Sequence, residues 1–403
     1  MKLLSGSYNG DGTTGRVFSG FGFQPNVVII KARTGSREGQ ISISSMGANA
    51  TKTISGNTSA GLTAGRITSL DSDGFTLGSD ATVNAVSTVY DWLALADDGA
   101  SDLHVGTYTG NGGSNAITGV GFQPNAVIIA SASTTVRCQW ASSDMPSGHC
   151  SNFGTATGVT NGTGVTSLDA DGFTLSTNNG INDSGVTYYY VAIKSVANKF
   201  SVVTYTGNGA DNRSITGAGF QPDNVITKDQ GQTVAAAFRG RLMSGDSSNK
   251  LDNTNNTTDF IQAFESDGFQ VGTATAANSN TFTYYAMNFK DTVTGDIPLY
   301  TPFLVFTREH DPAKIAPNTT YYFEAFIKAP SGQNCYARLY NVTDSVAVAG
   351  SAVSTGATTA TRVRSNAITL AAGSKVYRAE FGGNGGTGIF TCYGADIIAD
   401  VTR

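Results

Sequence analysis

The chain repeats one pattern three times, and this repetition constrains its fold more than any other feature of the sequence. The segment Gly22-Phe23-Gln24-Pro25 recurs as Gly121-Phe122-Gln123-Pro124 and as Gly219-Phe220-Gln221-Pro222. The prolines are separated by 99 and 98 residues, and a methionine follows each proline at the same distance. A period of this length indicates tandem domains, because the repeats of solenoid proteins span only about 20–50 residues.

Three further landmarks keep the same order in every copy. In the first copy they are Tyr8-Asn9-Gly10-Asp11-Gly12, Asp73-Gly74-Phe75 and the aromatic segment Tyr90-Asp91-Trp92. We therefore predict three copies of one domain over residues 1–102, 103–199 and 200–298, with the repeated phenylalanines in their cores. The corresponding landmarks are Tyr108-Thr109-Gly110-Asn111-Gly112, Asp171-Gly172-Phe173 and Tyr189-Tyr190-Val191, then Tyr205-Thr206-Gly207-Asn208-Gly209, Asp267-Gly268-Phe269 and Tyr284-Tyr285-Ala286.

The local patterns indicate β-strands joined by tight turns. A short β-branched run, Val27-Val28-Ile29-Ile30, follows the first proline, and proline tends to stand at the entrance of a strand. Pairs such as Asp11-Gly12 and Asn111-Gly112 favour type I′ turns, which need a positive φ angle. Many short strands separated by turn signals predict an all-β fold in which each repeat is a β-sandwich.

Residues 299–403 do not continue the repeat. A linker is predicted over residues 296–302, and later segments such as Tyr336-Ala337-Arg338-Leu339-Tyr340 have the composition of sandwich strands. Residues 299–403 carry nine basic and seven acidic residues, a net charge of +2, which leaves −7 for residues 1–298. We predict a fourth domain here, a different β-sandwich of the jelly-roll type with a separate task.

The composition excludes several functional classes. Charged residues make up 14% of the chain, against an average of about 25%, and the net charge is −5. A nucleic-acid partner is not expected, because binding to phosphates requires a basic surface. Membrane insertion is not expected either, since the apolar runs are far shorter than the ~20 residues of a membrane span. The opening residues lack the apolar stretch of a secretory signal peptide, so no signal peptide is expected.

Two groups of residues resemble metal sites, and both have a simpler interpretation. Asp71-Ser72-Asp73-Gly74 and Asp169-Ala170-Asp171-Gly172 resemble calcium loops, but the third acid and the distal glutamate of the calcium pattern are missing. We interpret them as hairpin turns. Cys138, His149 and Cys150 lack the ligand spacing of a zinc site, and Cys138 fits a core position better. Spacing alone leaves two disulfides open, Cys138–Cys150 and Cys335–Cys392.

Nothing in the sequence points to catalysis, to a metal requirement or to a cofactor. The three histidines, His104, His149 and His310, stand outside any metalloprotease motif. A nucleophile elbow of the Gly-x-Ser-x-Gly type does not occur. The acidic residues mostly occupy turn positions, which does not favour the paired carboxylates of a glycosidase. We therefore do not expect an enzyme.

Aromatic residues are the remaining candidates for function. In the fourth domain Tyr336, Arg338 and Tyr340 alternate with a cysteine, an alanine and a leucine, so the two sets face opposite sides of one strand. If the first set is exposed, two tyrosines and an arginine form a patch suited to a glycan or a protein partner. The alternative is that a neighbouring subunit or the other sheet covers this set.

The repeats resemble a module of tailed-phage virion proteins. The shared pattern is G-x-Y-x-G-N-G, then I-T-G-x-G-F-Q-P, then S-x-D-G-F and a closing tyrosine strand. The second copy matches it best, with Gly106-Thr107-Tyr108-Thr109-Gly110-Asn111-Gly112 and Ile117-Thr118-Gly119-Val120-Gly121-Phe122-Gln123-Pro124. This resemblance covers about three quarters of the chain. It implies a concanavalin-like or related β-sandwich without catalytic residues. The fourth domain is similar to carbohydrate-binding-like jelly rolls appended to phage structural proteins.

The resemblance implies a non-catalytic structural or adhesive protein of a bacteriophage virion, either a tail fibre or a capsid or tail decoration protein. Such a protein is made in the host cytoplasm and needs no signal peptide. Its expected partners are other virion proteins and host-surface glycans. A homotrimer is the first expectation, because phage fibres are commonly trimers, but one chain with three repeats could imitate a threefold assembly as a monomer. The alternatives are a bacterial carbohydrate-binding surface protein and, third, a glycan-active enzyme.

Overall fold

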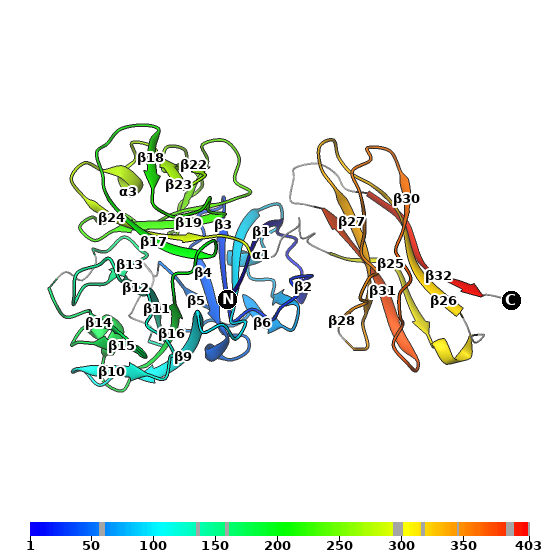
Figure 1. Cartoon of the computed structure of the whole chain (residues 1–403), viewed down its shortest axis with the longest axis horizontal. Helices are drawn as coiled ribbons and strands as arrows, with labels where there is room; N and C mark the ends of the chain where they lie inside the picture. The colour runs from blue at the N-terminus through cyan, green and yellow to red at the C-terminus, as the bar shows by residue number, and fades with distance from the viewer. Residues whose placement is uncertain are drawn as a thin grey trace. The chain divides into compact units, whose positions relative to one another are not determined.

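Contacts divide the chain into two compact parts. The computed structural model describes residues 1–55, 61–133, 138–157, 161–292, 301–315, 319–344, 346–383 and 391–401. The first part contains residues 1–16 and 23–294, and the second part contains residues 17–22 and 295–403. Figure 1 shows that each part is built almost entirely from strands. Of the predicted linker, residues 296–300 lie outside the described residues.

Each of the three repeats folds into two antiparallel sheets, one of five strands and one of three, which confirms the all-β prediction. The strand that opens a repeat pairs with the strand that closes it, and the strand after Gly-Phe-Gln-Pro lies on the other side of the closing strand. In repeat 1 the sheets are β1 (Lys2–Asn9), β8 (Val89–Ala96), β3 (Val27–Ala32), β4 (Gln40–Ile43) and β5 (Lys52–Thr53), and β2 (Arg16–Ser19), β7 (Gly74–Leu77) and β6 (Ile67–Asp71).

Repeats 2 and 3 reproduce this order strand for strand, and every repeat has a four-residue helix before its closing strand. The helices are α1 (Ala81–Asn84), α2 (Asn179–Asn182) and α3 (Thr275–Asn278). Repeat 2 contains β9 (Leu103–Thr109), β16 (Thr187–Ile193), β11 (Ala126–Ser131), β12 (Gln139–Ser142) and β13 (Ser151–Asn152), and β10 (Asn115–Thr118), β15 (Gly172–Leu175) and β14 (Val165–Asp169). Repeat 3 contains β17 (Phe200–Thr206), β24 (Thr283–Phe289), β19 (Asn224–Asp229), β20 (Ala237–Gly240) and β21 (Asn249–Lys250), and β18 (Arg213–Thr216), β23 (Gly268–Val271) and β22 (Ile261–Glu265).

Strand register corrects one detail of the predicted closing strands. Tyr108 pairs with Tyr188 in repeat 2, just as Tyr8 pairs with Tyr90 in repeat 1. The predicted segment of repeat 2 began at Tyr189 and is therefore one residue out of phase. Three consecutive tyrosines cause this error, because a run of identical residues carries no signal about which of them faces the core.

The phenylalanines of both repeated motifs lie in the cores, as predicted. Those of Asp-Gly-Phe are fully buried in all three repeats, and those of Gly-Phe-Gln-Pro are at most 7% exposed. Equal burial at equivalent positions is what copies of one domain should show. These residues are Phe75, Phe173 and Phe269, and Phe23, Phe122 and Phe220.

The three repeats also share a core with one another. All six residues of β3 are buried, so both faces of this strand are covered. Ile29 of β3, Ile128 of β11 and Ile226 of β19 belong to one buried cluster that draws residues from all three repeats. The short β-branched run after each proline is thus a strand buried on both faces, which explains why it does not alternate with polar residues.

Equivalent edges of the repeats meet in cyclic order. The N–H of Gly39 in repeat 1 donates to the carbonyl oxygen of Leu251 in repeat 3 at 2.8 Å. The N–H of Ala236 in repeat 3 donates to the carbonyl oxygen of Phe153 in repeat 2 at 3.0 Å. In repeat 2, the Sγ atom of Cys138 lies 3.9 Å from a backbone carbonyl oxygen of repeat 1, which closes the circle. The first part is therefore one unit with an approximate threefold repetition.

The second part contains two further antiparallel sheets around its own core, to which Cys335, Ala337 and Leu339 contribute fully buried side chains. Among the described residues of the whole chain, no helix is long and apolar enough to cross a membrane. One sheet consists of β25 (Thr301–His310), β31 (Lys375–Gly383), β27 (Cys335–Asn341) and β28 (Val346–Ala347), with β29 (Val353–Thr355) also paired to β27, and the other of β30 (Thr361–Arg364), β26 (Thr319–Lys328) and β32 (Thr391–Val401).

Candidate functional site

The glutamine of each Gly-Phe-Gln-Pro motif joins the two sheets of its repeat by a hydrogen bond. Nε2 of Gln123 donates to the carbonyl oxygen of Leu168 at 2.6 Å, and Nε2 of Gln24 donates to that of Leu70 at 2.8 Å. The third copy makes the same bond at 3.1 Å. The motif is therefore structural, since its one polar side chain is bound within the repeat.

The aspartates of the segments that resemble calcium loops accept hydrogen bonds from their own repeat. In repeat 2, Asp169 accepts a hydrogen bond from Oγ1 of Thr174 at 2.7 Å within its hairpin. Asp171 accepts from the N–H groups of Gly121 at 2.6 Å and Gly119 at 3.0 Å, which lie in the loop before Gln123. These two bonds lower the pKa of Asp171. The carboxylate oxygens thus tie the Asp-Gly-Phe hairpin to the Gly-Phe-Gln-Pro loop.

Cys138, His149 and Cys150 have separate partners. Sγ of Cys150 lies 2.8 Å from Oε1 of Gln139, and Nδ1 of His149 lies 3.0 Å from Oε1 of Gln230 in repeat 3. Burial raises the pKa of Cys138 to about 12, so this thiol stays protonated at neutral pH. All four cysteines are free thiols. Among the described residues, no cluster of three or more His, Cys, Asp or Glu side chains could hold a metal ion.

The predicted patch on β27 lies on the face of its sheet opposite the core. Nε of Arg338 donates to Oε2 of Glu380 at 2.9 Å. The ring centroid of Tyr340 lies 5.8 Å from the guanidinium carbon of Arg338 and 4.6 Å from that of Arg378. Arg338 and Tyr340 are 5% and 9% exposed, and Tyr336 is partly exposed. The three side chains therefore share a face, and their part in recognition stays a prediction.

A more exposed aromatic pair lies on the other sheet of the second part. Phe326 of β26 and Tyr393 of β32 are 43% and 56% exposed, and their ring centroids are 5.5 Å apart. Among the residues whose side-chain burial the structure describes, no other aromatic ring is as open to solvent. Phe326 lines a hollow of about 420 Å³, together with Gly394, Glu324, Arg362 and Asp396, and Tyr393 stands next to Gly394 in the chain.

A β-bulge produces this arrangement. Phe326 pairs with Gly394, but Ile327 pairs with Cys392, so Tyr393 is the extra residue of β32. Bulges re-aim a side chain, and here the bulge turns Tyr393 outward beside Phe326. Gly394 has no side chain, and a Cβ atom added there would meet nothing within 4 Å, so the floor between the rings is open. We call Phe326, Tyr393 and Gly394 the aromatic slot.

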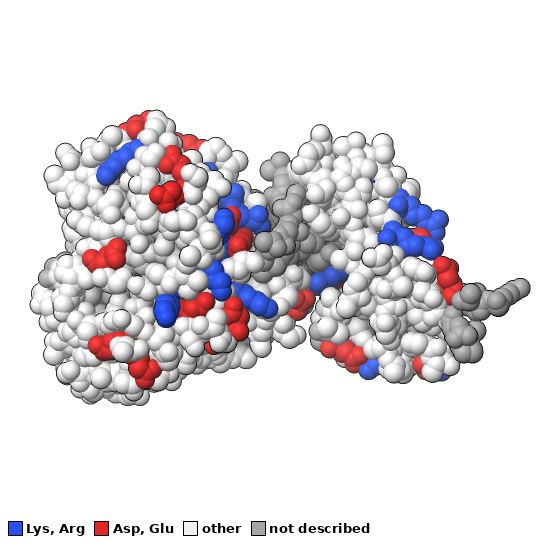
Figure 2. Space-filling model, in the orientation of Figure 1, with Lys and Arg blue, Asp and Glu red and all other residues white. Residues whose placement is uncertain are grey.

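Charged residues form an ordered row beside the aromatic slot. Glu324 accepts a hydrogen bond from Nε of Arg364 at 2.8 Å and also pairs with Arg362. Arg364 in turn lies 3.3 Å from a carboxylate oxygen of Asp400. Burial acts to raise the pKa of Glu324, but hydrogen bonds from the two arginines outweigh it and lower the pKa. Figure 2 shows these charges gathered at β30 and β26, whereas most of the surface in view is uncharged.

The sequence carries half of the signal of the aromatic slot, which was not predicted from it. Along β26, Glu324 and Phe326 alternate with the buried residues Phe323 and Ala325, so Phe326 stands in the solvent-facing phase of the strand. A large apolar residue in that phase is exposed, and it marks a contact surface only when another apolar side chain lies beside it. Tyr393 gave no such signal, because a bulge shifts the phase of its strand and the sequence does not reveal the bulge.

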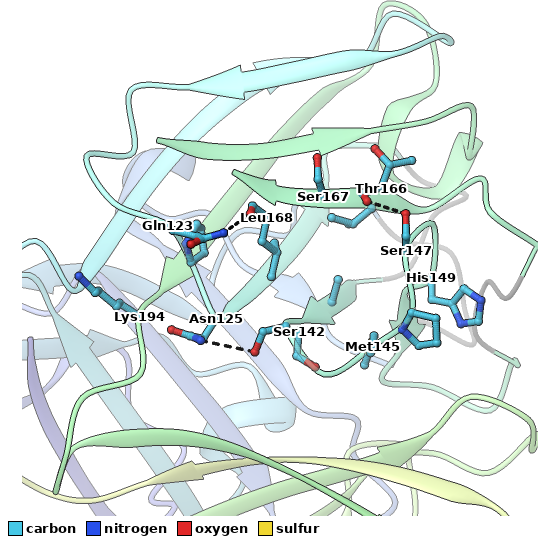
Figure 3. A pocket seen from close by; sticks show the side chains of 15 residues that line it. Gln123, Asn125, Ser142, Met145, Ser147, His149, Thr166, Ser167, Leu168 and Lys194 are labelled. Carbon is cyan, nitrogen blue, oxygen red and sulfur yellow. Dashed lines mark hydrogen bonds between the residues drawn. The ribbon is translucent and has the colours of Figure 1, made fainter. Parts of the chain in front are cut away.

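The first part has a polar pocket of about 520 Å³ within repeat 2. The loop after β12, the Gly-Phe-Gln-Pro loop and β14 surround it, and Figure 3 shows Lys194 at one end and His149 at the other. Ala141, Met145 and Ser147 also line it, and none of its lining residues is acidic. We call this cavity the repeat 2 pocket.

Comparison with known proteins finds one family. A family model described as "Domain of unknown function (DUF7483)" matches residues 4–104, 98–195 and 194–297. The three matches coincide with the three repeats and together cover more than half of the chain. No curated protein and no solved structure matches the chain.

Proposed function

The chain belongs to the DUF7483 family, and we propose that it is a non-catalytic structural and adhesive protein whose second part binds glycans through the aromatic slot. The exposed pair of Phe326 and Tyr393 is the observation that supports this proposal. Sugar rings present apolar C–H faces that stack on aromatic rings, and the open floor at Gly394 leaves room for such a face. Arg362 and Asp396 beside the slot offer the polar contacts that orient a ligand.

A binding role suits the slot better than catalysis does. Glu324 and Asp396 are register partners on adjacent strands, so two carboxylates do lie near the rings. However, a glycosidase needs one carboxylic acid with a raised pKa as its proton donor. The arginines lower the pKa of Glu324 instead, which favours recognition without hydrolysis.

The first part fits a scaffold role. Its three repeats form one unit with a common core. The glutamine side chains of its repeated motifs form hydrogen bonds within their own repeats. We propose that this unit is a component of a bacteriophage virion, as a tail fibre or a capsid or tail decoration protein, on the resemblance of the repeats to such modules. A bacterial carbohydrate-binding surface protein is the second candidate. Electron microscopy of purified virions with an antibody against this chain distinguishes the two.

Glycan binding is tested with a glycan array and titration of the strongest hits. Phe326→Ala and Tyr393→Ala should each weaken binding at least tenfold, because each removes one stacking ring. Val346→Ala is the matched control, since Val346 is a 50% exposed apolar residue on the other sheet. A Tyr336→Ala, Arg338→Ala, Tyr340→Ala triple variant tests the β27 patch separately. Glycan binding unaffected by either slot variant would contradict the proposed site.

A further inference from the structure

The repeat 2 pocket has an apolar recess at Ala141. Strand register places Ser42 of repeat 1, Ala141 of repeat 2 and Arg239 of repeat 3 at equivalent positions. Oγ of Ser42 donates to the carbonyl oxygen of Ala50 at 2.9 Å, and the guanidinium of Arg239 donates to that of Ile261 in the three-stranded sheet at 3.1 Å. The alanine side chain ends at Cβ and has no polar group, so in repeat 2 this position forms part of the wall of a cavity.

Apolar side chains continue this wall. Met145, Val165 and Leu168 line the pocket together with Ala141, and the first two are buried. The pocket volume of about 520 Å³ lies within the range of small-molecule sites. A recess with such walls suits a small apolar group of a ligand, because a charged group there would lose its hydration.

The polar side chains beside the recess offer hydrogen-bond acceptors. Nε2 of Gln123 donates to the carbonyl oxygen of Leu168, while its Oε1 accepts no hydrogen bond from any described residue. Oγ of Ser147 donates to the carbonyl oxygen of Thr166 at 2.7 Å, so its proton is used and its lone pairs remain available. Acceptors of this kind suit a ligand with several hydroxyl groups, as a sugar has.

A lysine stands at one end of the pocket, where Figure 3 shows it near Gln123 and Asn125. Lys194 is exposed, and within the described part of the chain its ammonium group has no hydrogen bond or ion pair. Its counterpart in repeat 3, Lys290, donates to the carbonyl oxygen of Gln221 at 2.9 Å, so a lysine at this position reaches the Gly-Phe-Gln-Pro loop. None of the lining residues is acidic, which leaves the charge of Lys194 to an anionic ligand.

We propose that the repeat 2 pocket binds the terminal acidic sugar of a glycan, a ring that carries a carboxylate and an acylamino group. The carboxylate pairs with Lys194, the acyl methyl group enters the recess at Ala141, and ring hydroxyl groups donate to Gln123 and Ser147. The choice of a glycan rests on the proposed adhesive function, but the site lies in the first part and does not require the aromatic slot.

Calorimetric titration with the methyl α-glycoside of N-acetylneuraminic acid tests the proposal. We expect the full chain to bind it with a dissociation constant of about 1 mM or tighter. N-acetylglucosamine, which lacks the carboxylate, and glucuronic acid, which lacks the acyl group, should each bind at least ~5-fold more weakly. Equal binding of N-acetylglucosamine, or no binding of the glycoside at ~20 mM, would overturn the proposal.

The Phe326→Ala variant separates this site from the aromatic slot. Its affinity for the N-acetylneuraminic acid glycoside should equal that of the unchanged chain, even if the slot fails to bind any glycan. A loss of affinity in this variant would place the acidic sugar in the slot and overturn the assignment to repeat 2.

Two further substitutions locate the site. Lys194→Met should weaken binding at least ~5-fold, because it removes the cation that pairs with the carboxylate. Lys290→Met, at the equivalent position of repeat 3, is the matched control and should leave the affinity unchanged. Ala141→Leu should abolish binding, since the larger side chain fills the recess. Lys194 is exposed, so its variant keeps the test valid if Ala141→Leu disturbs the fold. Unchanged affinity in Lys194→Met would refute the site.

Discussion

One buried asparagine in each repeat joins three segments of the chain by hydrogen bonds. Its replacement by alanine should therefore lower the stability of the protein strongly. Nδ2 of Asn182 donates to the carbonyl oxygens of Gly113 at 2.6 Å and Ser176 at 2.8 Å, and its Oδ1 accepts from the N–H of Asn111 at 3.0 Å. Asn182→Ala should lower the free energy of unfolding by about 2–4 kcal/mol, because buried backbone groups lose their partners. Asn179→Ala, on the exposed side of the same helix, is the control for urea denaturation, and equal losses would contradict the prediction.

A buried lysine makes stability depend on pH. Nζ of Lys31 donates to the carbonyl oxygens of Arg37 at 2.6 Å and of Thr254, in repeat 3, at 3.0 Å. Burial lowers its pKa to about 7, from 10.5 in the unfolded chain. Between these values the unfolded chain binds more protons, so the free energy of unfolding should rise with pH, by about 3 kcal/mol from pH 7 to 10. Lys31→Met should flatten this rise in urea denaturation, and Lys290→Met should not.

At the scale of elements, a glycine directly after the opening strand of each repeat lets the chain pass close to the loop that follows the short helix. A Cβ atom on Gly110 would lie 2.2 Å from the carbonyl oxygen of Asp183, and the equivalent glycines of the other repeats meet the same obstacle. Gly110→Ala should therefore destabilise the protein by about 2–3 kcal/mol. Gly113→Ala, in the same loop, has only a 3.8 Å contact and should be nearly neutral. Similar melting temperatures for both variants would refute the steric argument.

The Asp-Gly-Phe hairpins yield a prediction about metal removal. Asp171 and Asp169 accept hydrogen bonds from their own repeat, and these bonds do not require a metal ion. Thermal melts with and without EDTA should therefore coincide. A large fall of the melting temperature in EDTA would instead support the calcium interpretation of these acids.

At the scale of the whole molecule, the repeats already form inside one chain the contacts that a threefold assembly forms between chains. Their β-branched strands meet in a common core, and their edges bond in cyclic order. This favours the monomer over the homotrimer that the resemblance suggested first. Multi-angle light scattering should give a mass near 41.7 kDa, and a mass three times larger would support the homotrimer.

The sequence predicts more of the fold than of the candidate sites. Motifs such as Gly-Phe-Gln-Pro act within one repeat, so their recurrence predicted the repeats and their buried phenylalanines. The structural role of Asn182 was not predicted, although asparagine recurs at Asn84 and Asn278 with nearly the same spacing. The role of this asparagine depends on carbonyl groups far away in the chain, which no local pattern identifies.

The all-β class, the three copies and the change of pattern after residue 298 can be predicted from the sequence, because they follow from local periodicity and repetition. The common core of the repeats and the bulge that exposes Tyr393 follow from the tertiary structure alone. Each of these depends on which distant segments meet and in which register. A single residue of shift decides whether a side chain is buried or exposed, and that shift is set by packing across the whole fold.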